Sequence, residues 1–81
     1  MELLSGAQRS LGSDPKKSLE LLARHQRGYP KGDFAEEREV IRIDALVRLG
    51  RRDEAIARAG EHQRRYPQSA HRPRVEALLA K

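Results

Sequence analysis

Three histidines are the first candidates for chemistry, because imidazole is the commonest metal ligand in proteins and titrates near neutral pH. His25 and His62 stand 37 residues apart in two nearly identical hexamers, residues 25–30 and 62–67, and His71 follows. Equivalent positions in successive structural units are too far apart to share one ion, and no two histidines have the i, i+4 spacing of a helical metal site. We therefore expect no metal site. Each histidine is instead expected in the last turn of a helix, where a cation or polar group favours the exposed carbonyls.

Paired carboxylates are the second candidate, since two neighbouring acids can divide general acid and general base roles. Glu36, Glu37 and Glu39 crowd one short stretch. That stretch falls in the first turns of a predicted helix, where negative charge compensates the helix dipole. The chain also has no glycine-rich phosphate loop and no nucleophile elbow. The sequence therefore predicts no enzyme and no cofactor.

Basic residues are the third candidate, and they raise the question of nucleic acid. The 81-residue chain has 17 basic and 12 acidic side chains, a net charge of +5. Several arginines have an acid four positions earlier, which predicts a surface of mixed sign rather than a basic stripe. These expected pairs are Glu20–Arg24, Asp44–Arg48, Glu54–Arg58 and Glu61–Arg65. Nucleic-acid binding through a basic surface therefore stays as the alternative function.

Helical signals order the whole chain, and no stretch alternates as a strand does. The expected helices cover residues 1–11, 15–27, 33–49 and 53–66, with a last helix starting at Ser69 or Arg72 and running to residue 81. Gly12 suits a left-handed position after the first helix, while Asp14 and Pro15 suit the N-cap and first turn of the second. No apolar run is long enough to span a membrane. The sequence predicts an all-α protein.

The apolar pattern assigns places to these helices. In the second helix the stripe Leu19, Leu22, Ala23 and Gln26 should face inward. The third helix opens with Asp33 and Glu36 at capping-box spacing and is apolar on more than one face, so we expect it at the centre. Tyr29 and Tyr66, each followed by proline, should pack over helix ends.

The fourth predicted helix carries a recognisable spacing. Gly50, Ala55, Ala59 and Pro67 stand where a tetratricopeptide repeat has its helix-ending glycine, two packing residues and closing proline, and the chain resembles that family. The same pattern returns, with one extra turn residue, at Gly12, Ser18, Leu22 and Pro30. The resemblance implies a five-helix α-solenoid in one domain over residues 1–81. It would consist of two helical hairpins, units 1–30 and 33–67, and a capping helix over 69–81.

The resemblance also implies a function. Repeats of this family are non-catalytic protein–protein interaction modules whose first helices line a concave groove. Arg38, Arg42, Arg72 and Arg74 fall on those helices and are the predicted partner-binding residues, suited to an acidic peptide or a carboxylate terminus. Two and a half repeats lie near the minimum for stability, which favours a larger complex or a homo-oligomer.

The compartment stays open at this stage. The Tyr66–Ser69 ending resembles divergent repeats of bacterial envelope proteins, and similar short arrays occur in bacterial regulators. The N-terminus lacks a signal peptide, so the chain as written is expected in the cytoplasm, and in the envelope if a leader has been removed.

Overall fold

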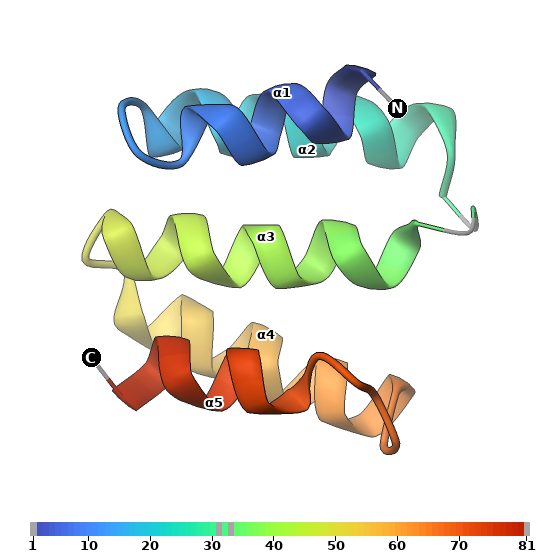
Figure 1. Cartoon of the computed structure of the whole chain (residues 1–81), viewed down its shortest axis with the longest axis vertical. Helices are drawn as coiled ribbons and strands as arrows, with labels where there is room; N and C mark the ends of the chain where they lie inside the picture. Colours follow the sequence, from blue (N-terminus) through green and yellow to red (C-terminus); the bar gives the residue numbers. More distant parts are fainter. Residues whose placement is uncertain (1, 31, 33, 81) are drawn as a thin grey trace.

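The computed structural model describes residues 2–30, 32 and 34–80 (Figure 1). Within these ranges the chain is all-helical, as predicted, with no strand. Its five helices are α1 (Glu2–Ser10), α2 (Pro15–Gly28), α3 (Ala35–Arg48), α4 (Arg52–Arg65) and α5 (Arg72–Ala80). None of them is both long and apolar enough to cross a bilayer.

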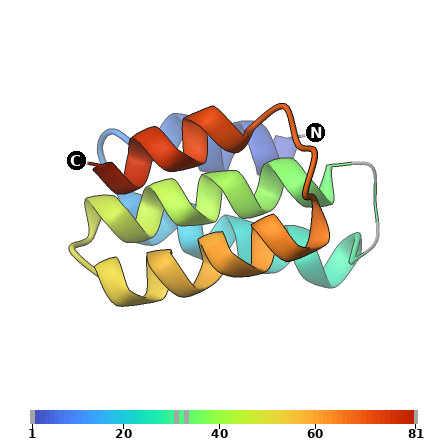
Figure 2. The same cartoon turned by 90° about the horizontal axis from the view of Figure 1, so that it is seen from below.

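The helices form two layers around α3. Figures 1 and 2 show α1, α3 and α5 side by side in one layer, with α2 and α4 behind them. Helix α3 packs against each of the other four, whereas α1 and α2 lie on one side of it and α4 and α5 on the other. All seven residues from 40 to 46 are buried, so α3 is the central helix that its apolar pattern predicted.

The apolar interior divides into two clusters that meet at α3. The first joins α1, α2 and α3 and contains Leu4, Ala7, Leu11, Leu22, Ile41 and Ala45. The second joins α3, α4 and α5 and contains Val40, Ile43, Leu46, Ala55, Val75 and Leu78. Each cluster is small, and the two share one helix, so neither half of the molecule has a core of its own without α3.

The 37-residue repeat of the sequence reappears in the helix boundaries. Helices α2 and α4 begin at Pro15 and Arg52, and α3 and α5 begin at Ala35 and Arg72, each pair 37 residues apart. The ends of α2 and α4 also match, because Tyr29 N–H and Tyr66 N–H each donate to the carbonyl four residues earlier at 2.8 Å. The two segments therefore share local structure as well as sequence.

Turn chemistry explains most helix ends and corrects one expectation. Asp14 caps α2 by accepting a hydrogen bond from the Lys17 amide at 3.2 Å, as predicted. Gly12 is not left-handed, because among the described residues only Gly50 has a positive φ, of 75°. The turn after α1 closes instead through the Ser13 and Asp14 amides, which both donate to the Ser10 carbonyl.

The predicted capping box of α3 involves Asp33, which lies outside the described residues. Helix α3 begins at Ala35, and the residue before it, Phe34, makes no side-chain capping bond. Glu36 is used elsewhere, in contacts with α4 and the segment before α5.

Candidate functional site

The four arginines predicted to bind a partner lie in three different places. Arg38 and Arg42 are buried on α3 at the junction with α2 and α4. Arg74 lines a groove between α1, α3 and α5, and Arg72 lines a second groove between α4 and α5. The structure does not bring them together into one surface.

Arg38 closes the C-terminal end of α2. Its residue is 3% exposed, and its guanidinium donates to the Tyr29 carbonyl at 3.0 Å and to the Pro30 carbonyl at 3.4 Å. The same nitrogen that reaches Tyr29 lies 3.4 Å from Nδ1 of His25. These carbonyls stand at the negative end of the α2 dipole, which stabilises a cation there. Arg38 therefore joins the first unit to α3 through its charge.

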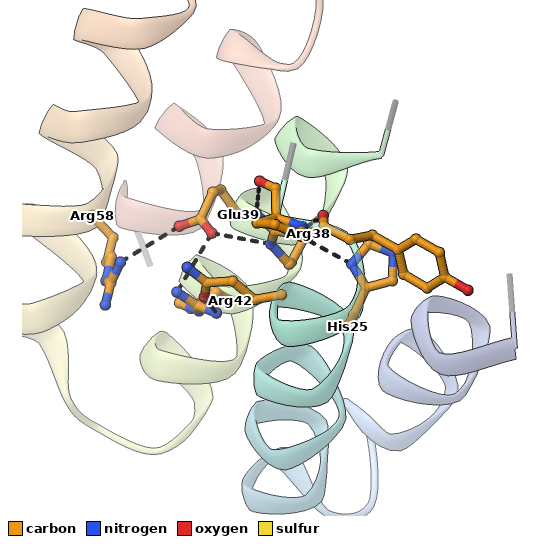
Figure 3. A network of polar contacts seen from close by, with 8 residues as sticks. His25, Arg38, Glu39, Arg42 and Arg58 are labelled. Atoms are coloured by element: carbon orange, nitrogen blue, oxygen red, sulfur yellow. Dashed lines mark hydrogen bonds and ion pairs between the residues drawn. The ribbon is translucent and has the colours of Figure 1, made fainter. Parts of the chain in front are cut away.

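Glu39 stands among three guanidinium groups (Figure 3). Its carboxylate lies 3.6 Å from Arg38, 3.4 Å from Arg42 and 3.7 Å from Arg58 of α4. Arg42 also donates to the Gln26 side-chain oxygen at 2.9 Å. Burial, reinforced by repulsion from Arg58 and Arg38, lowers the pKa of Arg42, although Glu39 opposes that shift. The network thus connects α2, α3 and α4, and Glu39 does more than compensate the dipole of its own helix.

The two repeat histidines are buried, which sequence reasoning did not foresee. His25 is 0% exposed and His62 is 3% exposed. Each ring packs on the tyrosine four residues later, with ring centroids 5.4 Å apart in both units. In α2 the inward positions are Ser18, Leu22 and His25, while Gln26 is exposed. The histidines therefore belong to the interior of each unit and do not cover exposed carbonyls.

The surroundings of the two rings carry opposite charge. Burial, followed by the charge of Arg38, lowers the pKa of His25, so that ring is held neutral. His62 Nε2 instead donates to the Glu36 carboxylate at 2.9 Å, and the Ser69 hydroxyl donates to the same oxygen. Burial raises the pKa of Glu36, but the hydrogen bonds from Ser69 and His62 and the nearby histidine charge bring it below its ordinary value. Across the described ranges no three potential ligands converge as a metal site would require.

The predicted ion pairs form only in part. Arg48 donates to Asp44 at 2.7 Å, as the i, i+4 spacing indicated. Residues of two other predicted pairs have different partners, because side chains of neighbouring turns and helices compete for the same acids. Glu54 pairs with Arg51, Glu61 with Arg64, and Arg58 reaches Glu39 on another helix.

The groove between α1, α3 and α5 is one of the open sites in the described part of the chain. Its wall on α1 is Leu4, Ser5, Gln8 and Arg9, and the remaining lining residues are Phe34, Glu37, Ile41 and Arg74. Phe34 is 44% exposed, which is unusual for the one phenylalanine of the chain. Sequence reasoning found Arg74 but missed Arg9 and Phe34, although an unpaired aromatic beside a helix start was a usable signal.

The two arginines of this groove make few ion pairs with the described residues. Arg9 is exposed and makes no ion pair with any described residue. Arg74 is 44% exposed and lies 3.6 Å from the buried Asp44 carboxylate. Asp44 is also paired with Arg48 at 2.7 Å, so Arg74 can turn toward another carboxylate without leaving Asp44 unpaired.

No protein-family model, curated protein or solved structure matches this chain.

Proposed function

We propose that this chain is a non-catalytic, tetratricopeptide-like helical-repeat module that binds a segment of another protein in the groove between α1, α3 and α5. Three observations support the repeat assignment. The helix boundaries recur after 37 residues, the His–Tyr packing recurs with them, and successive helices alternate between two layers. In such an array the layer of first helices is the binding surface, and α1, α3 and α5 occupy that layer.

The single observation that carries the binding proposal is a groove of mixed character in which three apolar residues stand beside two arginines. Leu4, Ile41 and the exposed ring of Phe34 offer the apolar contact. Arg9 on α1 and Arg74 on α5 stand on its two outer helices. The partner segment that fits is a peptide with an apolar side chain flanked by carboxylates, since Arg binds carboxylate through two parallel hydrogen bonds.

In this proposal the partner-binding arginines are Arg74, which the sequence predicted, and Arg9, which it did not. Arg38 and Arg42 act indirectly, because their internal contacts hold α3 in place against α2. The resemblance to bacterial repeat proteins makes an envelope or regulatory complex the proposed setting.

A pair of labelled synthetic peptides tests the proposal. Both carry the same central leucine and phenylalanine, and the flanking residues are glutamates in one and lysines in the other. Fluorescence anisotropy should show binding of the acidic peptide, and the Arg9→Glu plus Arg74→Glu protein should bind it about tenfold or more weakly, a loss of about 1.4 kcal/mol. The same double variant should gain affinity for the basic peptide.

Arg64→Glu is the matched control, because Arg64 is an exposed arginine of α4 outside the groove. It changes the net charge in the same direction and should leave the affinity nearly unchanged. Equal losses in the control and the groove variants would show that only the overall charge matters. Absence of acidic-peptide binding at about 1 mM would remove the acidic-segment proposal.

A further inference from the structure

The end of the molecule opposite α1 and α2 carries a second groove, between α4 and α5. We call this surface the end face, and its exposed and half-buried members include Ile56, Gly60, Gln63, Arg72, Glu76 and Leu79. Figure 1 shows α4 and α5 at the opposite end from α1 and α2, with α3 between the two pairs. The end face is therefore separate from the groove between α1, α3 and α5.

The internal repeat shows what a surface of this kind is built to contact. The position of Ile56 in the second unit corresponds to Leu19 in the first, 37 residues earlier. Leu19 packs against both apolar clusters, because the second unit is stacked on it. Ile56 has no further unit beside it and is 50% exposed. A terminal repeat that keeps an exposed aliphatic side chain on its outer face lacks the fully polar cap that keeps a stack soluble.

The opposite end of the molecule does not complement this face. Where the structure describes burial in α1 and α2, at residues 4–10 and 15–28, the leucines are buried or half-buried and the exposed positions are polar or glycine. Head-to-tail stacking would place Ile56 on a polar surface. Pairing two end faces about a two-fold axis instead places apolar residues of one copy against apolar residues of the other.

The charges of the end face are suited to such a pair. Arg72 and Glu76 are 54% and 62% exposed at the side chain and lie 3.7 Å apart. A surface that carries both signs side by side is complementary to itself after a two-fold rotation, since each arginine can face the glutamate of the other copy.

We propose that the end face binds the end face of a second copy of this chain, forming a symmetric dimer through Ile56 and Leu79 with crossed Arg72–Glu76 pairs at the edge. This proposal goes beyond partner binding and does not depend on it, because the groove between α1, α3 and α5 stays open in the dimer. Loss of peptide binding and loss of dimerisation can therefore be measured separately.

Sedimentation equilibrium between about 1 µM and 1 mM protein tests the proposal. The native chain should change from monomer to dimer within this range. Ile56→Lys should remain monomeric. Tyr29→Lys is a matched control, because Tyr29 is 51% exposed and lies outside the end face, and it should dimerise like the native chain. Circular dichroism should show the same helix content in both variants.

A charge exchange distinguishes self-pairing from binding of another partner. Arg72→Glu should weaken the dimer about tenfold or more, since like charges then meet across the axis, and adding Glu76→Arg should restore it. A native chain that stays monomeric at 1 mM would overturn the proposal, at about the concentration limit of the experiment. Equal effects of Ile56→Lys and Tyr29→Lys, or no recovery in the double exchange, would overturn it as well.

Discussion

At the scale of single residues, the interior of this small protein contains charged side chains. Arg38, Arg42 and Asp44 are all buried, in a chain whose apolar fraction is 37%. Each buried charge has a partner, because an unpaired one would cost several kcal/mol. The long apolar stems of the arginines fill space that a leaner core would leave empty. Buried arginine is thus part of how a chain poor in large apolar residues completes its interior.

The neutral state of His25 predicts a pH dependence of stability. The pKa of His25 is lowered in the folded chain from its ordinary value of 6.5. Below that value the His25 imidazole binds a proton more readily in the unfolded chain than in the folded chain. The free energy of unfolding should therefore fall as pH falls. The stability that the neutral His25 ring contributes should be fully present at pH values above the ordinary pKa of 6.5. Urea unfolding at about pH 7.5 and about pH 5.5 measures the loss.

His25→Gln should lose less stability over the same pH interval, because its side chain does not titrate and its amide oxygen can still accept from Arg38. His71→Gln serves as the comparison, since His71 lies outside the His–Tyr pairs. An unchanged pH dependence in His25→Gln would show that the loss arises elsewhere.

The sequence predicted that the two histidines occupy equivalent positions but not that they are buried. The reason is that the apolar pattern did not decide which face of the helix turns inward at its end. Leu22 faces inward whether the stripe continues through His25 or through Gln26, which differ by about 100° around the helix. The deciding contacts, with Arg38 and with Tyr29, come from outside the helical turn and leave no periodic signal. The groove residue Arg74 was found because it stands on a first helix, whereas Arg38 on the same kind of helix turned out to be buried.

At the scale of elements, the helix ends were the most predictable part of the structure. Asp14 with Pro15, Gly50, and the Tyr–Pro pairs are local signals, and a local signal needs no knowledge of the rest of the fold. The five helices accordingly lie where the sequence placed them, within a few residues. Gly12 was misread because a glycine after a helix can also sit in an ordinary right-handed turn.

The two turn glycines make a matched pair for mutation. Gly50 has φ of 75°, where an added Cβ is strained although no atom lies within 4 Å of it. Gly50→Ala should therefore lower the free energy of unfolding by about 1–2 kcal/mol. Gly12 has neither a positive φ nor a close neighbour, so Gly12→Ala should change stability by less than about 0.5 kcal/mol. Urea unfolding of the two variants gives both values, and a larger loss at Gly12 would contradict the turn assignment.

At the scale of the whole molecule, α3 joins the α1–α2 pair and the α4–α5 pair into one folding unit. It supplies Ile41 and Ala45 to the first apolar cluster and Val40, Ile43 and Leu46 to the second. The relation between the units could be inferred from the echo of residues 25–30 in 62–67. The contacts that link the two halves could not be inferred from the sequence, because they are buried polar contacts of Arg38, Arg42 and Glu39.

This shared helix predicts that damage in the second cluster is felt in the first unit. Ile43 is fully buried among residues of α3, α4 and α5. Ile43→Ala should lower the free energy of unfolding by about 2–5 kcal/mol. Hydrogen exchange should then accelerate at the α2 amides as well as at the α4 amides, because both depend on α3.

Gln63→Ala is the control for that measurement, since Gln63 is exposed on α4 and its loss should leave exchange in both hairpins close to native. Faster exchange confined to α4 and α5 in Ile43→Ala would show that the first unit folds by itself.

The matched stacking of Tyr29 on His25 and Tyr66 on His62 has a practical consequence. The chain contains these two tyrosines and no tryptophan, so all of its tyrosine emission comes from one ring in each half. Replacing either ring by phenylalanine leaves a single tyrosine beside an imidazole. Each tyrosine can therefore report on its own hairpin by fluorescence, and the two halves can be followed separately without an attached dye.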